Sequence, residues 1–218
     1  MMSPMDHRHV VWDWNGTLLD DVDASVATFN SLLAERSLPL LDRGRYTSWF
    51  EFPAKQFYRK CGIVAEGAEW DALAKTYHDR ITASPLQRLQ PDAVDALEAV
   101  RRAGAGQSIL SALRQDILER QLEEFGLRRY FHRVCGSDNL DGAGKKDKGL
   151  SLACALRGAG FSPAMAGDTL TDAETAAYCG MPCALVSRGH QSAERLRGAC
   201  VPVFGTLVEA AAWCLSRS

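Results

Sequence analysis

The order of the apolar segments limits the fold of this chain more than any other feature. After Pro91, short apolar segments with the character of strands alternate with segments that have helical spacing. Strands that alternate with helices predict a parallel sheet covered by helices on both faces. The expected strands are "QSILSA" (107–112), "FHRVCGS" (131–137), "PAMAGD" (163–168), "PCALVS" (182–187) and "VPVF" (201–204), and the expected helices cover 92–104, 116–127, 148–160, 172–180 and 206–216.

One further strand lies far upstream of this alternation. "RHVVWDW" (8–14) has the pattern of a short buried strand, and residues 21–89 then contain only helical or irregular segments. That stretch is too long for one crossover connection. The sequence therefore predicts an α/β fold, in which a Rossmann-like parallel sheet core (1–20 and 90–218) carries an all-helical cap (21–89) inserted after strand one. The expected cap helices begin near Asp21, with Asp20 or Asp21 as the N-cap, and include "FPAKQFYRKCGI" (52–63) and 67–83.

Composition narrows the classes of function. The formal net charge is -2 with mixed signs throughout, which indicates no binding to nucleic acid or to an anionic membrane surface. No apolar run approaches the ~20 residues of a membrane helix, and "MMSPMDHRH" at the start lacks the apolar segment of a signal peptide. The seven cysteines form no C-x-x-C pair, which is typical of reduced thiols. These features favour a cytoplasmic protein. We also expect a monomer or homodimer whose partner is a small molecule.

Polar side chains of several kinds follow the expected strands. Strand one ends at Asp13 and Asn15. Ser111 lies at the end of "QSILSA", and "PAMAGD" ends at Asp168, with Asp172 on the first turn of the next helix. In open α/β sheets, ligands bind beyond the carboxyl ends of the strands. We therefore expect these side chains to converge at one edge of the sheet.

The chemistry of this set points to phosphoryl transfer. "GAGKKDKG" (142–149) adds a lysine just before a helix. Aspartates with a backbone carbonyl form an oxygen-rich site of the kind that Mg²⁺ prefers. A lysine and a hydroxyl suit an anionic phosphoryl group. Each residue alone has an ordinary explanation as a helix cap or a solvated charge, but four such features in order, each at the appropriate end of its element, favour a binding site.

Four segments of the chain resemble the four motifs of the haloacid dehalogenase superfamily. Within that superfamily the chain is most similar to the phosphoglycolate-phosphatase-like hydrolases that have a helical cap after motif one. The resemblance covers essentially the whole chain. It implies a Mg²⁺-dependent phosphatase that hydrolyses a small phosphorylated metabolite through an aspartyl-phosphate intermediate. The four segments are "DWNGTLLD" (13–20), "SILSA" (108–112), "GKKDKG" (144–149) and "GDTLTD" (167–172).

The resemblance also implies a role for each matching residue. Asp13 would be the nucleophile. Mg²⁺ would be held by the side chains of Asp13 and Asp168 and by the backbone carbonyl of Asn15. Asp172 would support the metal through water or orient the motif-three lysine. The phosphate-binding group would comprise Ser111 and Lys145 with the turn residues Gly16 and Thr17, and Asp20 would lie at the hinge that leads into the cap.

Two assignments stay open. Three lysines crowd motif three, and the spacing to Gly149 favours Lys145 over Lys146 and Lys148. Substrate specificity in this group comes from the cap and from loops that face the core. The candidates for it here are Arg45, Lys55, Arg59 and His190.

Asn15 departs from the family pattern. The family has an aspartate at this position, which protonates the leaving alcohol and then activates the hydrolytic water. Asparagine cannot transfer a proton, and general acid–base catalysis typically contributes ~10²–10⁴-fold. Three explanations are compatible with Asn15: a substrate with a good leaving group or its own acid, a slow enzyme or phosphate-ligand-binding protein, or an engineered replacement. Other chemistry of the superfamily is the alternative: carbon–halogen hydrolysis, or carbon–phosphorus hydrolysis with a cap lysine such as Lys55, Lys60 or Lys75.

Overall fold

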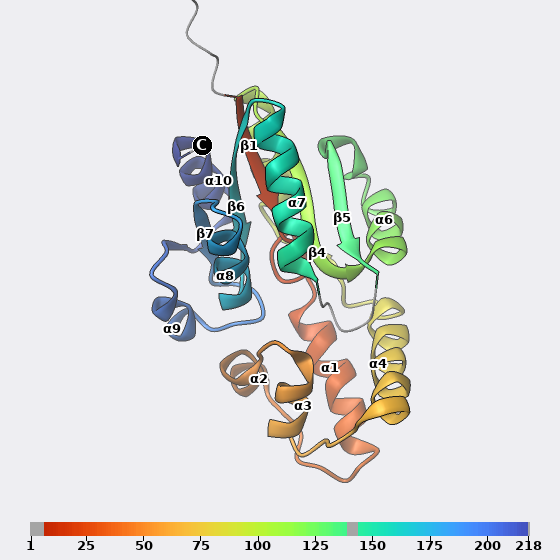
Figure 1. Cartoon of the computed structure of the whole chain (residues 1–218). Coiled ribbons are helices and arrows are strands. Elements are labelled where there is room, and N and C mark those ends of the chain that lie inside the picture. The colour runs from red at the N-terminus through yellow and green to blue at the C-terminus, as the bar shows by residue number, and fades with distance from the viewer. Residues whose placement is uncertain (1–6, 139–143, 218) are drawn as a thin grey trace, which may run out of the picture.

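The computed structural model describes residues 7–138 and 144–217. Figure 1 shows an α/β core with a group of helices, α1 to α4, at one end of its sheet. Within the described residues the main sheet has six strands in the order β5-β4-β1-β6-β7-β8, and every neighbouring pair is parallel. The predicted parallel α/β fold is therefore confirmed. The strands are β1 (His7–Trp12), β4 (Gly106–Arg114), β5 (Arg133–Ser137), β6 (Phe161–Gly167), β7 (Cys183–Val186) and β8 (Val203–Phe204).

Helices cover both faces of this sheet. Side chains alternate between the faces along a strand, so Val10 and Trp12 of β1 pack with α5, α6 and α10, while Val11 packs with α7 and α8. These positions are fully buried, which explains why the strands are nearly continuous apolar runs. The core helices are α5 (Ala93–Arg102), α6 (Gln115–Glu124), α7 (Lys145–Gly158), α8 (Leu170–Tyr178), α9 (Ala193–Leu196) and α10 (Leu207–Arg217), with 3-10 turns at Arg128–Tyr130 and Arg197–Ala199.

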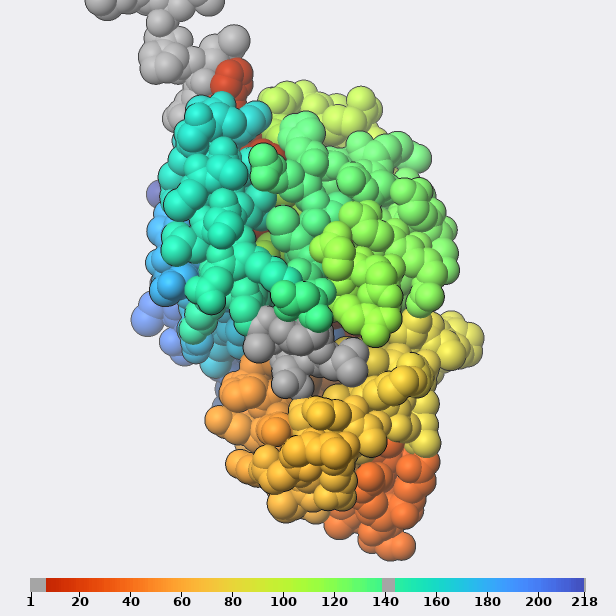
Figure 2. Space-filling view, turned by 45° about the vertical axis from the view of Figure 1, so that its right-hand side comes forward, coloured from red at the N-terminus to blue at the C-terminus, as the bar shows by residue number. Residues whose placement is uncertain are grey.

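The helical insertion follows β1 and has its own apolar cluster. Phe29, Phe57 and Trp70 are among the buried side chains of that cluster. The chain enters and leaves the insertion through a two-stranded antiparallel ribbon, β2 (Leu19–Asp20) with β3 (Arg88–Leu89), which is separate from the main sheet. Figure 2 shows the insertion, in orange and yellow, below the green and teal part of the core. Its helices are α1 (Val22–Ala34), α2 (Arg43–Trp49), α3 (Ala54–Lys60) and α4 (Gly67–Thr82).

Several details differ from the sequence-based expectations. Helix α2 was not predicted, because Tyr46 is its one buried residue and the segment shows no apolar period. Helix α7 begins at Lys145 rather than at Lys148, so the motif-three lysine is the first residue of the helix. Asp21 occupies the N-cap position of α1, but its side chain does not cap the helix. In the part of the chain that the structure describes, none of the helices combines the length and apolar character needed to cross a membrane.

Candidate active site

The sheet register brings the strand-end residues to one edge. Trp12 at the end of β1 pairs with Ile109 of β4 and with Ala166 of β6. Ser111 and Asp168, each two residues further along, therefore lie at the level of the loop that follows β1. Both are buried, with 2% and 0% of their surface exposed. The predicted convergence at the carboxyl end of the sheet is thus a feature of the structure.

Lys145 joins two of the aspartates. Its ammonium Nζ lies 2.6 Å from Oδ1 of Asp13 and 2.6 Å from Oδ1 of Asp172. Lys146 instead pairs with Glu174 at the surface, and Lys148 donates to the carbonyl of Gly136. Of the three candidate lysines, the one favoured by its spacing to Gly149 is therefore the one that contacts Asp13. Asp172 contacts Lys145 directly, as a role in orienting this lysine requires, and it also belongs to the group of buried carboxylates that could hold a metal ion.

Hydrogen bonds from the backbone fix Asp172. It is the third residue of α8, and its Oδ2 accepts from the amide and hydroxyl of Thr169 at 3.0 and 2.7 Å. This reciprocal capping box satisfies free amides at the start of the helix. One carboxylate oxygen of Asp172 therefore holds the helix terminus, and the other holds Lys145.

Thr17 connects the third aspartate, Asp168, to Asp13. Its hydroxyl lies 3.0 Å from Oδ1 of Asp168 and 3.3 Å from Oδ2 of Asp13. Gly16 precedes it with a φ of +74°, and a Cβ on Gly16 would lie 2.2 Å from Oδ2 of Asp168. Only glycine fits both the backbone conformation and the available space. The Gly-Thr turn therefore sets the position of Asp168 against the loop after β1.

Burial is the largest influence on the pKa values of Asp13 and Asp168. Burial raises the pKa of Asp13 to about 6, although the Lys145 ammonium opposes the increase. Burial also raises the pKa of Asp168 to about 8; His190 lowers it, and the charges of Asp13 and Asp172 raise it further. Burial alone would lower the pKa of Lys145, but Asp13 and Asp172 raise it above its ordinary value. The site thus carries more negative charge than one lysine offsets.

This donor set fits a divalent cation. One carboxylate oxygen from each of Asp13, Asp168 and Asp172 lies within 4.8 Å of the others. Hard cations such as Mg²⁺ take oxygen ligands of this kind. A cation among these oxygens would offset the repulsion between buried carboxylates.

Asn15 and Asp21 form a second group beside the aspartates. Oδ2 of Asp21 accepts from Nδ2 of Asn15 at 2.8 Å, and Oδ1 accepts from the amide of Gly16 at 2.8 Å and from Nε2 of His190 at 3.1 Å. Burial would raise the pKa of Asp21, but His190, Asn15 and Gly16 together lower it. The sequence predicts Asp21 only as a possible helix cap, because no local pattern indicates its contact with Asn15.

His190 connects Asn15 and Asp21 with both the α/β core and the helical insertion. Its backbone amide donates to Oδ2 of Asp168 at 2.6 Å, and its Nδ1 lies 3.0 Å from the hydroxyl of Tyr46 on α2. Burial would lower the pKa of His190, but Asp21 and Asp168 raise it to about 9. His190 was proposed as a specificity residue, and the structure places it in the buried layer between the core and the insertion.

The other three specificity candidates lie on the insertion. Lys55 and Arg59 both pair with Glu66 and are partly neutralised. Arg45 stacks on the ring of Trp49, with its guanidinium carbon 5.0 Å from the ring centroid. None of the three contacts the aspartates.

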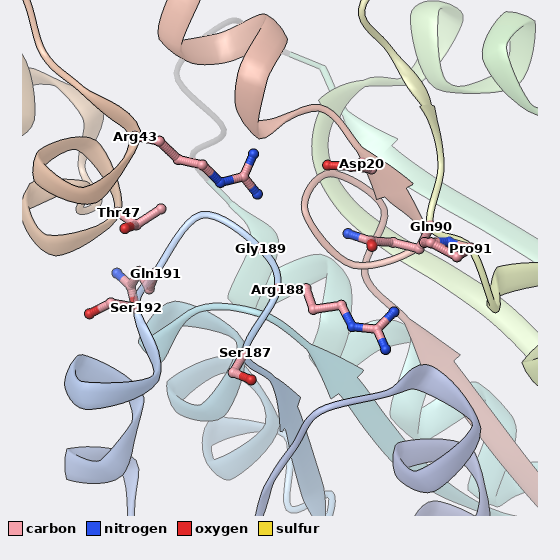
Figure 3. A pocket seen from close by; sticks show the side chains of 10 residues that line it. All are labelled: Asp20, Arg43, Thr47, Gln90, Pro91, Ser187, Arg188, Gly189, Gln191 and Ser192. Carbon is pink, nitrogen blue, oxygen red and sulfur yellow. The ribbon is translucent and has the colours of Figure 1, made fainter.

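A pocket of about 450 Å³ opens where the insertion, its connections and the core meet (Figure 3). Arg43 of α2 and Arg188 of the loop after β7 belong to opposite walls, and they pair with Asp23 and Asp92, respectively. Gly189 separates the pocket from the aspartates, because a Cβ there would lie 2.1 Å from Oδ2 of Asp168. The lining residues are Asp20, Arg43, Thr47, Gln90, Pro91, Ser187, Arg188, Gly189, Gln191 and Ser192.

The fold and this site define an α/β protein with a helical insertion after its first strand and a buried carboxylate centre at the carboxyl end of its parallel sheet. Residues 10–186 match the family of haloacid dehalogenase-like hydrolases, and the chain belongs to that family. It is 29% identical over 189 residues to a phosphoglycolate phosphatase of Caulobacter vibrioides, covering 83% of this chain and 79% of the relative. It is 27% identical over 194 residues to phosphoglycolate phosphatase 1 of Pseudomonas aeruginosa, covering 84% of this chain and 70% of that relative.

Solved structures show the same fold over nearly the whole chain. A haloacid dehalogenase-like family hydrolase from Streptococcus pneumoniae has a TM-score of 0.76 at 18% identity, covering 95% of this chain and 98% of the other. Protein Tyrosine Kinase A of Mycobacterium tuberculosis has a TM-score of 0.77 at 22% identity, covering 96% of this chain and 99% of the other. Proteins with different names share this fold, so the fold alone does not identify the reaction.

Proposed function

We propose that this protein is a Mg²⁺-dependent phosphatase that hydrolyses a small phosphorylated metabolite through an aspartyl phosphate on Asp13. The observation that carries the proposal is the contact of Asp13 with Lys145, inside a group of three buried carboxylates. The similarity to phosphoglycolate phosphatases supports a small phosphate ester as the substrate. It makes 2-phosphoglycolate the first compound to test.

The residues of the site suit a two-step reaction. A carboxylate oxygen of Asp13 would attack phosphorus, the phosphorus–oxygen ester bond would break, and the alcohol would leave with a proton from solvent or substrate. Water would then attack the phosphorus of the acyl phosphate, which releases inorganic phosphate and restores Asp13. Lys145 and Ser111 would bind phosphoryl oxygens throughout, and such positioning supplies most of the catalysis of phosphoryl transfer. Bound Mg²⁺, held by Asp13, Asp168 and the carbonyl of Asn15, would add positive charge that neutralises these oxygens.

The insertion would act as a cap. It spans residues 21–89 in this proposal, with hinges near Asp20 and Gln90. These positions coincide with the ribbon of β2 and β3, which is separate from the main sheet. A closed cap excludes water from the reacting atoms.

Asn15 supports a second candidate, a protein that binds phosphorylated ligands and turns them over slowly. The Asn15 amide cannot supply or take the proton that both steps require. The experiment that separates the two candidates is a panel of phosphate esters, acyl phosphates and phosphonates incubated with Mg²⁺. We expect phosphate release that EDTA abolishes, that added Mg²⁺ restores, and that Asp13→Asn removes for every substrate. Full activity in metal-free buffer would contradict the proposal of a Mg²⁺-dependent phosphatase. Binding of these compounds without turnover would favour the second candidate, a ligand-binding protein.

A further inference from the structure

We propose that Asp21 is a positioning residue that holds the carboxamide of Asn15 in one orientation in the loop that carries Asp13. This inference rests on the proposed phosphatase function, and it adds a residue outside the four motifs to that site. It also gives Asn15 a defined role as a fixed, neutral hydrogen-bonding group.

The contacts of Asp21 leave its carboxylate little freedom. The residue is 2% exposed. One oxygen takes the Asn15 amide at 2.8 Å, and the other takes the amide of Gly16 and the ring of His190. The donors from Gly16 and His190 therefore hold the carboxylate of Asp21 in place, and the carboxylate in turn holds the amide of Asn15.

The ordinary reason for an aspartate at this position does not apply. Asp21 is the N-cap of α1, where a carboxylate usually accepts from an amide of the first helical turn. Asp42, the N-cap of α2, caps its helix in this way: its side chain accepts from the amide of Arg45 at 2.7 Å. The carboxylate of Asp21 makes no such bond and is turned toward Asn15. The helix therefore does not account for the presence of Asp21.

The chemistry of the pair determines how the amide of Asn15 is oriented. An ionised carboxylate only accepts hydrogen bonds, so Asn15 must direct its NH₂ group toward Asp21. The flipped amide would place two acceptor oxygens 2.8 Å apart. In the described residues, the carbonyl Oδ1 of Asn15 has no hydrogen-bond donor. This oxygen and the second N–H of the Asn15 amide can therefore form hydrogen bonds with a molecule bound at the site.

A double-mutant cycle tests this inference with p-nitrophenyl phosphate and Mg²⁺. Asp21→Ser is the first variant, because serine is a good N-cap and supports α1 without reaching Asn15 as a carboxylate does. Asp21→Thr, which also keeps an N-cap hydroxyl, is the second variant if the first is unstable. Hydrogen bonds to charged groups are strong enough that we expect kcat to fall about 10-fold or more, with a smaller change in KM. In an Asn15→Ala background the same substitution should change kcat less than about threefold.

Asp20→Ser is the matched control for the cycle. Its carboxylate is the neighbour of Asp21 but pairs with Arg88 at 2.8 Å. Its effect on kcat should be the same in the wild type and in the Asn15→Ala background. An equal effect of Asp21→Ser in both backgrounds would overturn the proposal, since Asp21 would then act through His190, Gly16 or the fold.

A spectroscopic measurement tests the contact without turnover. The side-chain NH₂ signals of Asn15 can be assigned in ¹⁵N–¹H spectra by their loss in Asn15→Ala. We expect one of the two protons to be shifted downfield by the carboxylate, and the shift to disappear in Asp21→Ser. Unchanged Asn15 signals would overturn the inference. A wild-type protein that has these signals but hydrolyses no substrate would contradict the phosphatase proposal and still support the contact.

Discussion

At the scale of single residues, Asn15 can be replaced by the aspartate that the family motif has. The new carboxyl would lie against Asp21, where a 2.8 Å hydrogen bond now joins the two side chains. Two carboxyls at this distance share a proton, which keeps an acid available near neutral pH. We expect Asn15→Asp to speed hydrolysis of alkyl phosphates by about 10²-fold or more, and of aryl or acyl phosphates much less. A plot of rate against leaving-group pKa should be steep for the wild type and shallow for the variant; parallel lines would mean that position 15 does not handle the proton.

Gly16 is a second residue whose identity the site requires. A Cβ there would lie 2.2 Å from Asp168, and the φ of +74° is unfavourable for alanine. Gly104 has a similar φ of +70°, but a Cβ on it would meet no atom within 4 Å. Gly104→Ala should therefore carry only the backbone cost of about 1–2 kcal/mol in unfolding free energy. Gly16→Ala should lose more stability and at least about tenfold in kcat, because Asp168 must move. Denaturant unfolding and phosphatase assays of both variants check this, and equal behaviour would contradict it.

At the scale of elements, the sequence predicted the long helices and the buried strands but missed α2, α9 and the ribbon of β2 and β3. Helix α4 has an apolar stripe over sixteen residues, which is enough for a period to be recognised. Helix α2 has seven residues, and its formation depends on contacts distant in the sequence. Tyr46 reaches His190, which is 144 residues away in the chain. Such contacts leave no periodic signal in the sequence.

The same element, α2, is tied to the core by Arg195. Its guanidinium donates to the carbonyls of Ser48 and Phe50 at 3.1 and 2.6 Å, and nearby the amide of Ser192 donates across the same boundary to Thr47 at 3.1 Å. If the insertion moves as a cap, Arg195→Ala should favour opening. Loss of charged hydrogen bonds should then speed hydrogen exchange of the Ser192 amide about tenfold or more.

Arg197→Ala is the control for this experiment, because Arg197 is exposed and makes no ion pair in the described part of the chain. Exchange of the Ser192 amide in this variant should match that of the wild type. Equal acceleration in both variants, or in neither, would mean that Arg195 does not hold the insertion closed.

At the scale of the whole molecule, the assembly of the site was only partly predictable. The rule that ligands bind at the carboxyl ends of parallel strands brought Asp13, Ser111 and Asp168 together from sequence alone. The contact between Asn15 and Asp21 depends on the positive φ of Gly16 and on a loop more than 160 residues away, which supplies His190. The φ of Gly16 and the position of His190 arise only in the folded chain. The contact between Asn15 and Asp21 could therefore not be predicted from the sequence.

The stability of the whole molecule should depend on pH through His9, a buried residue of β1 far from the carboxyl end of the strand. His9 is 0% exposed, its Nε2 lies 2.8 Å from the hydroxyl of Ser108, and its ring fills the space that a Cβ on Gly106 would occupy. Burial, with the nearby charges of His132 and Arg133, lowers the pKa of His9 from 6.5 to about 4. Between these two pH values the unfolded chain binds the proton and the folded chain does not, so stability falls as the pH falls from about 6.5 toward 4. This dependence is absent above that window.

The linkage predicts a loss of about 2 kcal/mol in the free energy of unfolding between about pH 8 and pH 5 from this one group. Other groups titrate over the same range, so the measurement is a comparison. Urea unfolding at both pH values should show that the wild type loses about 2 kcal/mol more than His9→Gln, a variant that keeps a polar group facing Ser108 and removes the titration. The comparison concerns the change with pH, so a lower absolute stability of the variant does not affect it. Identical pH dependence of the two proteins would mean that His9 accepts its proton in the folded state, which would require the strand beside Gly106 to open.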